Sequence, residues 1–200
     1  MSQAVEISKV VPPRVIAGAV RIFAARGLDA SSLADLARAA GLSNAGLLHH
    51  VPSKAHLYRP VLSAAETDLR ERLLTAVDGL NSPEARLTAL LEAQRLWALE
   101  RPEAARLLLR ELMDNSARVA DAHVFPLASL LDMIEQEVAA VLVSRGETRA
   151  TPLAVAITMI GSLAYAAAVH PTLARLRPGG TDLGAWLGDV TAATALMLED

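Results

Sequence analysis

The stretch LADLARAAGLSNAGLLHHVP, residues 33–52, decides the fold of this chain. Two short helical patterns meet at Gly41, which can take the left-handed backbone conformation that a tight turn needs. Ala37 is small at a place where two helices must cross closely. The apolar contacts between the two helices are expected from Leu36, Ala40, Leu42 and Leu47. This is the spacing of a helix-turn-helix unit.

In a helix-turn-helix unit that binds DNA, the second helix lies in the major groove and its first residues reach the base edges. Here those residues are Ser43, Asn44, Ala45 and Gly46. Asn44 is the side chain among them that can make a bidentate contact, most naturally to adenine. Ala45 and Gly46 allow close backbone approach or a thymine-methyl contact. The alternative for Asn44 is an ordinary exposed residue at a helix start.

Helical periodicity continues along nearly the whole chain, and no segment alternates in the manner of a strand, so we expect an all-α protein of about nine helices. Capping residues, prolines and glycines indicate the boundaries. The expected helices are 13–26, one from Ser31 or Ser32, one from Ser43 to Pro52, 53–80, one from Ser82, one from Pro102, 121–145 with a break at Pro126, one from Pro152 and one from Asp182. Pro60 is expected either to kink the fourth helix or to be tolerated near its start.

The charge of the chain is divided unevenly. The formal net charge is −3, but residues 1–60 carry seven Lys/Arg and three Asp/Glu, a net charge of +4, and the other 140 residues carry twelve and nineteen, a net charge of −7. A basic N-terminal unit attached to a larger acidic one is consistent with binding nucleic acid at one end. Chance is the alternative, because a segment of charge +4 is not rare.

The composition is that of a globular protein with no disulfides. The chain has 200 residues, 52% of them hydrophobic, and no cysteine. The start, MSQAVEISKVVPP, lacks a basic segment followed by an apolar one, so we expect no signal peptide and a cytoplasmic location. Residues 152–169 contain no charge, yet many are Ala or Gly. We interpret them as a buried or interface helix and expect no membrane association.

The run from Val15 to Tyr58, which includes SSLADLARAAGLSNAGLLHHVPSKAHLY, closely resembles the DNA-binding domain of the TetR family of bacterial transcriptional regulators. The segment RPEAARLLLREL, residues 101–112, also looks like one common in that family. The resemblance implies a flexible tail over 1–12, a helix-turn-helix domain over 13–58, and a helical domain over 59–200. In the family the second domain binds a small molecule and forms the homodimer.

The resemblance also implies which residues contact DNA phosphates. The end of the recognition helix and the start of the next helix do so in the family, which assigns this role to His49, His50 and Lys54. Ser32 is a further phosphate-contact candidate, and a plain helix cap is its alternative. The chain departs from the family at Leu48, where an aromatic residue is common, and at Val51, where phenylalanine is. Losing a tyrosine hydroxyl at Leu48 removes one expected DNA contact.

The paired histidines do not indicate a metal site, because adjacent residues on a helix point about 100° apart and cannot readily chelate one ion. We therefore expect no metal and no cofactor. We also expect no catalytic residues and no enzyme activity, because the sequence contains no Walker loop, GxGxxG, HExxH or nucleophile elbow.

A ligand pocket is expected among the central helices of the second domain. The candidate ligand-binding residues are Trp97, Met113, His123, Phe125, Met133, Met159 and Tyr165. Each of them has an ordinary core position as its alternative. Aromatic residues make up 3% of the chain, so the pocket should be mainly aliphatic and should suit a largely apolar effector.

The eighth and ninth helices are the expected dimer surface, as in the family. Small residues allow close helix approach and branched ones fill a four-helix seam. The candidate interface residues are Ile157, Ile160, Gly161, Ala164, Ala168, Leu187 and Val190. A monomer that buries the same residues internally is the alternative.

The sequence thus predicts a ligand-responsive regulator that binds a palindromic operator in double-stranded DNA as a homodimer, most often as a repressor in this family. A small, largely apolar effector would release it. The alternative is a helical ligand-binding or adaptor protein that has lost specific DNA binding.

Overall fold

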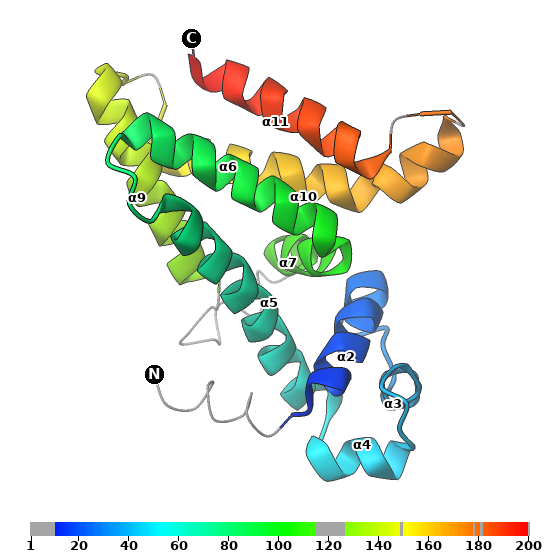
Figure 1. Cartoon of the computed structure of the whole chain (residues 1–200). Helices are drawn as coiled ribbons and strands as arrows, with labels where there is room; N and C mark the ends of the chain where they lie inside the picture. Colours follow the sequence, from blue (N-terminus) through cyan, green and yellow to red (C-terminus); the bar gives the residue numbers. More distant parts are fainter. Residues whose placement is uncertain (1–10, 115–126, 149, 178, 181, 200) are drawn as a thin grey trace.

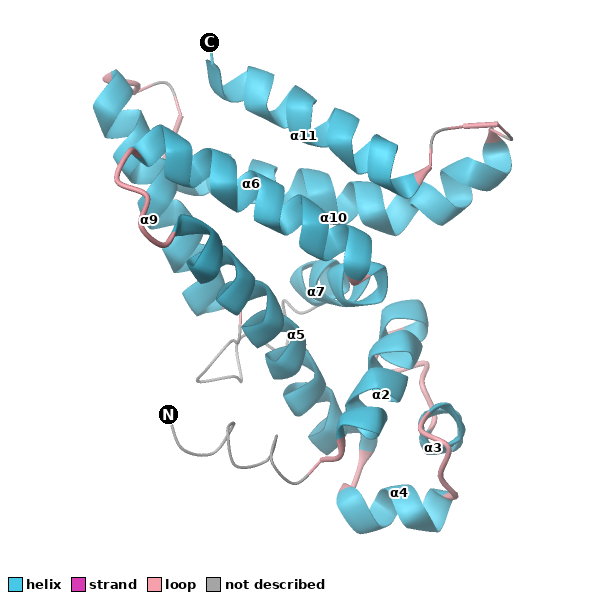
Figure 2. Cartoon of the chain, in the orientation of Figure 1, coloured by secondary structure: helices cyan, strands magenta, loops and turns pink. Residues whose placement is uncertain are grey.

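The computed structural model describes residues 11–148, except 115–126, and then 150–177, 179–180 and 182–199. Within these residues every regular element is a helix, which confirms the all-α expectation (Figures 1 and 2). The helices are α2 (Pro13–Arg26), α3 (Leu33–Ala39), α4 (Asn44–His50), α5 (Lys54–Val77), α6 (Pro83–Glu100), α7 (Pro102–Asp114), α9 (Ala128–Arg145), α10 (Pro152–Leu176) and α11 (Leu183–Glu199).

Short-range sequence signals determine where several helices begin. Ser32, Ser43, Ser53 and Ser82 each place a side-chain oxygen on the backbone N–H three residues ahead, at 3.1, 3.0, 3.3 and 3.3 Å. These bonds satisfy donors that the first turn of a helix leaves without a partner. Proline occupies the first position of α2, α6, α7 and α10, where its fixed φ suits the helix and no N–H is needed.

Three features of the helices bear on the predicted boundaries. The fourth predicted helix ends at Val77 rather than near residue 80, because the backbone turns at Gly79 with φ of 73°. Pro60 lies buried inside α5, which continues on both sides of it. The break predicted at Pro126 lies outside the described residues, and α9 begins at Ala128.

The helices α2, α3 and α4, which we call the head, pack around a small core at one end of the molecule (Figure 1). Phe23 and Leu47 are fully buried there. Gly18 lets α2 and α3 approach closely, because a Cβ at this position would lie 2.8 Å from the backbone of Ala39. After α3 the amides of Gly41 and Leu42 bond to the carbonyls of Arg38 and Ala37, which closes the turn into α4.

The helices α6, α7, α9, α10 and α11, which we call the body, form the other end of the molecule. The helix α5 runs from the head into the body, and α7 lies between the head and the remaining body helices (Figure 1). Arg86 of α6 forms an ion pair with Glu137 of α9, and its Nε lies 2.8 Å from Oε2. Arg106 of α7 donates to the carbonyl of Ala168 on α10 at 2.9 Å. These contacts join the body into one unit around a shared core.

Candidate DNA interface and effector cavity

The recognition helix α4 presents its first turn to solvent. Ser43, Asn44 and Ala45 are exposed and Gly46 is half-buried, whereas Leu47 faces inward and is fully buried. Leu48, where the sequence departs from the family pattern, is also exposed. One face of α4 therefore holds the helix in the head, and the other remains free to reach base edges, as the motif predicts.

A charged cluster fixes the start of α3. Arg26 and Arg38 lie 2.6 and 3.2 Å from the carboxylate of Asp35, and the Ser32 hydroxyl donates to the same carboxylate at 2.7 Å. The hydrogen bond from Ser32 and then the charges of the two arginines hold the pKa of Asp35 below its usual value, against the opposing effect of desolvation. The Ser32 side chain thus caps its helix and also contacts Asp35. A phosphate contact by the same residue is compatible with the cap and stays a prediction.

Lys54 has a structural contact that the sequence did not predict. Its Nζ donates to the carbonyls of Asp29 at 2.8 Å and Ser31 at 3.0 Å, and so ties the first turn of α5 to the loop between α2 and α3. An ammonium group has three hydrogens, so one remains for a phosphate. The predicted phosphate contact and this anchoring role are therefore compatible.

His49 and His50 lie at the end of α4. Their ring centroids are 5.6 Å apart at an interplanar angle of 70°, with His49 exposed and His50 half-buried. The ring of His56 faces the Ser53 hydroxyl, with Nδ1 and Oγ 2.8 Å apart. Imidazole groups at this turn can donate to phosphate oxygens, which is the role that the sequence assigns to the pair.

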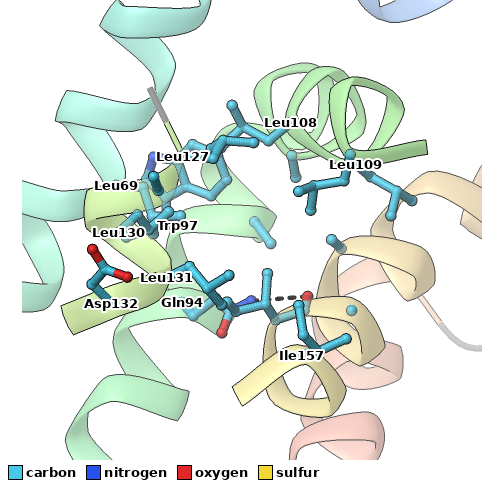
Figure 3. A pocket seen from close by; sticks show the side chains of 17 residues that line it. Leu69, Gln94, Trp97, Leu108, Leu109, Leu127, Leu130, Leu131, Asp132 and Ile157 are labelled. Atoms are coloured by element: carbon cyan, nitrogen blue, oxygen red, sulfur yellow. Dashed lines mark hydrogen bonds between the residues drawn. The ribbon is translucent and has the colours of Figure 1, made fainter. Parts of the chain in front are cut away.

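The body contains a cavity of about 200 Å³ between α5, α6, α7, α9 and α10 (Figure 3). Its wall is mostly leucine and alanine, with the indole of Trp97 on one side. Trp97 also donates through Nε1 to Asp68 of α5 at 2.6 Å. The described residues that line the cavity include no Lys, Arg or His. It is therefore suited to an apolar, uncharged molecule.

The seven residues predicted to bind the ligand are placed very differently. Trp97 lines the cavity, whereas Met159 is buried in the core and Met133 packs against that core, both outside the cavity wall. Met113 and Tyr165 are 72% and 63% exposed and also lie away from the cavity. His123 and Phe125 lie outside the described residues. The sequence missed Gln94, the leucines of α7 and the leucines of α9, whose role depends on which helix faces meet.

The residues predicted for the dimer seam divide into three groups. Ile157, Ile160, Gly161 and Ala164 line the cavity, because this part of α10 packs against α6 and α9. Leu187 is fully buried inside the protomer, so its side chain cannot lie on an outer surface. Ala168 and Val190 are half-buried. The helix α10 also has an exposed apolar surface, on which Leu153, Ile157 and Tyr165 are 44%, 46% and 63% exposed.

α10 is long and apolar enough to cross a membrane, the one described helix for which this holds. Of its most apolar 18-residue window, 33% is buried inside the chain.

The helix α7 connects the cavity to the head. Leu108 and Leu109 line the cavity, while Glu111 faces the start of α5 and accepts a hydrogen bond of 2.7 Å from the Tyr58 hydroxyl. Both side chains of this bond are buried. The ring of Tyr58 packs edge-to-face on Phe23 of α2, with the centroids 4.9 Å apart. A continuous chain of packed groups therefore runs from the cavity wall to the head.

A helix-turn-helix head on a helical body with an internal apolar cavity defines a ligand-binding class of transcription regulators. Residues 15–61 match the family model described as "Bacterial regulatory proteins, tetR family". Residues 15–61 therefore form a DNA-binding domain of the kind found in transcriptional regulators of the TetR family. A comparison with curated protein sequences finds no significant match.

Solved structures share the fold over most of the chain. A TetR transcriptional regulator from Chloroflexus aurantiacus has a TM-score of 0.68 and 20% identity, over 100% of this chain and 98% of that one. The regulator FadR from Bacillus subtilis, solved in complex with stearoyl-CoA, has a TM-score of 0.67 and 14% identity, over 90% and 96%. AibR, solved with isovaleryl coenzyme A and operator DNA, has a TM-score of 0.65 and 18% identity, over 91% and 95%.

Proposed function

We propose that this protein is a cytoplasmic repressor that binds a palindromic operator as a homodimer and is released when a small, largely apolar effector enters the cavity. The observation that carries the proposal is the position of α7, which contributes both to the cavity wall and to the contact with the head. The head over residues 13–58 would read DNA, and residues 59–200 would bind the effector and the second protomer. Two neighbours of the same fold were solved in complex with acyl-CoA molecules, which supports a small-molecule effector for this chain as well.

A homodimer is supported by the exposed apolar surface of α10. Leu153, Ile157 and Tyr165 lie on it, and burial against a second copy would remove this surface from water. One recognition helix makes too few base contacts for operator specificity, and two heads related by a two-fold axis double them. The two α4 helices would then enter successive major grooves, about 34 Å apart.

The packing of α7 supports a mechanism for this release. An effector that fills the cavity would press on Leu108 and Leu109, and α7 would pass the displacement to Tyr58 through Glu111. A change in the angle between the two heads would alter the distance between the two α4 helices, which would then no longer match the spacing of successive major grooves. Coupling free energies of this kind are typically about 1–3 kcal/mol, which corresponds to about 5- to 150-fold in DNA affinity.

The proposal is tested by selecting operator sequences from a random duplex pool with the full-length protein and comparing variants on the selected duplex. We expect an inverted repeat to be enriched, because a two-fold dimer reads two equal half-sites. Asn44→Ala should weaken binding to this duplex by at least about 30-fold, because a bidentate contact to one base in each of the two half-sites is lost, at about 1–3 kcal/mol each.

The matched control is Asn81→Ala, which changes an exposed asparagine in the loop before α6 and should leave the affinity unchanged. The slope of affinity against salt should be the same for both variants, since neither change removes a phosphate contact. Enrichment of no sequence would support instead a ligand-binding protein that has lost specific DNA binding.

Removing the Tyr58 hydroxyl tests the connection between body and head. We expect Tyr58→Phe to lower the free energy of unfolding by about 1–3 kcal/mol, because the buried carboxylate of Glu111 loses a donor. Urea denaturation measures this effect. Tyr165→Phe is the matched control, since the other tyrosine of the chain is exposed and should change the stability by less than about 0.5 kcal/mol. Equal effects of the two variants would remove the energetic basis for the connection.

A further inference from the structure

The cavity wall contains one buried side-chain amide, that of Gln94 on α6. Gln94 is 5% exposed, and its Nε2 donates to the backbone carbonyl of Ile160 on α10 at 3.1 Å (Figure 3). A carbonyl oxygen can only accept, so this bond fixes the orientation of the amide and identifies Oε1 as the other polar atom. Among the described residues no donor bonds to Oε1. An acceptor at the cavity wall that receives no hydrogen bond from the protein is available to a ligand that carries a donor.

The rest of the wall offers little for a charged ligand. Asp132 is the other polar residue of the wall, and it is exposed at the edge of the cavity. An anionic ligand would find no cation among the described lining residues and would meet this carboxylate at the edge. A cationic ligand would place its charge among leucine side chains, which cannot solvate it. An uncharged molecule avoids both costs.

The size of the cavity limits the ligand further. Its volume is about 200 Å³. An engineered apolar cavity of about 150 Å³ in another protein holds one benzene molecule. The present cavity therefore fits one small ring with a short substituent, and the nucleotide part of a coenzyme A thioester would have to remain outside it.

We infer that the effector is an uncharged, mainly apolar molecule of about the size of a substituted benzene ring, with one hydroxyl or N–H group that donates a hydrogen bond to Gln94 Oε1. This inference rests on the proposed function, which makes the cavity the effector site. Gln94 then determines specificity: the leucines accept any apolar body of the right size, and the amide selects ligands that carry a donor.

Three probes of nearly equal shape separate these contributions. 4-Isopropylphenol carries the donor, 4-isopropyltoluene replaces its hydroxyl by a methyl group, and 4-isopropylbenzoate carries a negative charge. Titration calorimetry of each probe into the full-length protein without DNA gives the three dissociation constants. We expect the phenol to bind about 10-fold more tightly than the toluene, because one buried hydrogen bond contributes about this factor. The benzoate should bind most weakly.

The variant Gln94→Met keeps the length of the side chain and removes the acceptor. In this variant the phenol and the toluene should bind with equal affinity. Leu109→Met is the matched control, since it changes an apolar wall residue and should preserve the 10-fold preference. Equal affinity of the two probes for the wild-type protein, tightest binding of the benzoate, binding of none of the three, or an unchanged preference in Gln94→Met would each overturn the inference.

These outcomes can be told apart from a failure of the proposed function. The calorimetry contains no DNA, so it reports the cavity alone. Operator binding by Gln94→Met should match that of the wild type, which verifies that the variant is folded. If the phenol binds with the expected preference and does not weaken operator binding, then the inference about the cavity stands and the proposed release mechanism fails.

Discussion

Replacing Tyr165 by glutamate should convert the protein to a monomer and weaken operator binding by at least about 100-fold. Tyr165 is 63% exposed on α10 and does not line the cavity, so the change acts on the proposed dimer seam and leaves the effector site intact. Two negative charges would meet near the two-fold axis with no water to solvate them. A single head retains half of the base and phosphate contacts. Analytical ultracentrifugation and fluorescence anisotropy measure the two effects.

The matched control is Leu74→Glu, which places the same charge on an exposed apolar position of α5, outside the proposed seam. This variant should stay dimeric and bind the operator as the wild type does. A dimeric Tyr165→Glu protein, or a wild-type protein that is monomeric while bound to its operator, would exclude α10 as the seam.

Phe23→Ala should lower the free energy of unfolding by about 3–5 kcal/mol, because it leaves a cavity at the centre of the head. Phe23 is 0% exposed and packs edge-to-face against Tyr58, with the ring centroids 4.9 Å apart. The head is small, so a loss of this size should also abolish operator binding near room temperature. Urea denaturation followed by circular dichroism measures the change in stability.

Leu48→Ala is the control for this prediction, since Leu48 is a large apolar residue of the same head but is 46% exposed. Its effect on stability should stay below about 0.5 kcal/mol. A loss of similar size in both variants would show that the burial of Phe23 does not determine the stability of the head.

The sequence predicted the head well because its signals are local. Ser32 and Ser43 cap helices within three residues of their own position, and Gly41 takes the left-handed conformation that the turn requires, with φ of 67°. The alternation of buried and exposed positions on α4 also follows from helical periodicity. Lys54 is the exception: its bonds to Asp29 and Ser31 join residues 23 to 25 positions away. Such a contact leaves no pattern in the sequence.

The cavity was harder to predict because it depends on how whole helices face one another. α10 is apolar on nearly every side, so periodicity cannot separate the face of Ile160, which lines the cavity, from that of exposed Tyr165. Large and sulfur-containing residues were predicted to line the pocket, yet Met159 is a core residue and Met113 is exposed. The sequence does not mark Gln94 as a cavity residue, since a lone glutamine in a helix is most often at the surface.

The central claim is that this protein reads a specific DNA sequence through its head. Fluorescence anisotropy of the full-length protein against labelled duplexes that tile the DNA around its own gene, at roughly 50 and 200 mM salt, tests it most directly. The account predicts tight binding to one fragment, weaker binding to its neighbours, and a loss of affinity at the higher salt concentration. Equal, weak binding to every fragment at both salt concentrations, together with no enriched sequence from the random pool, would contradict it.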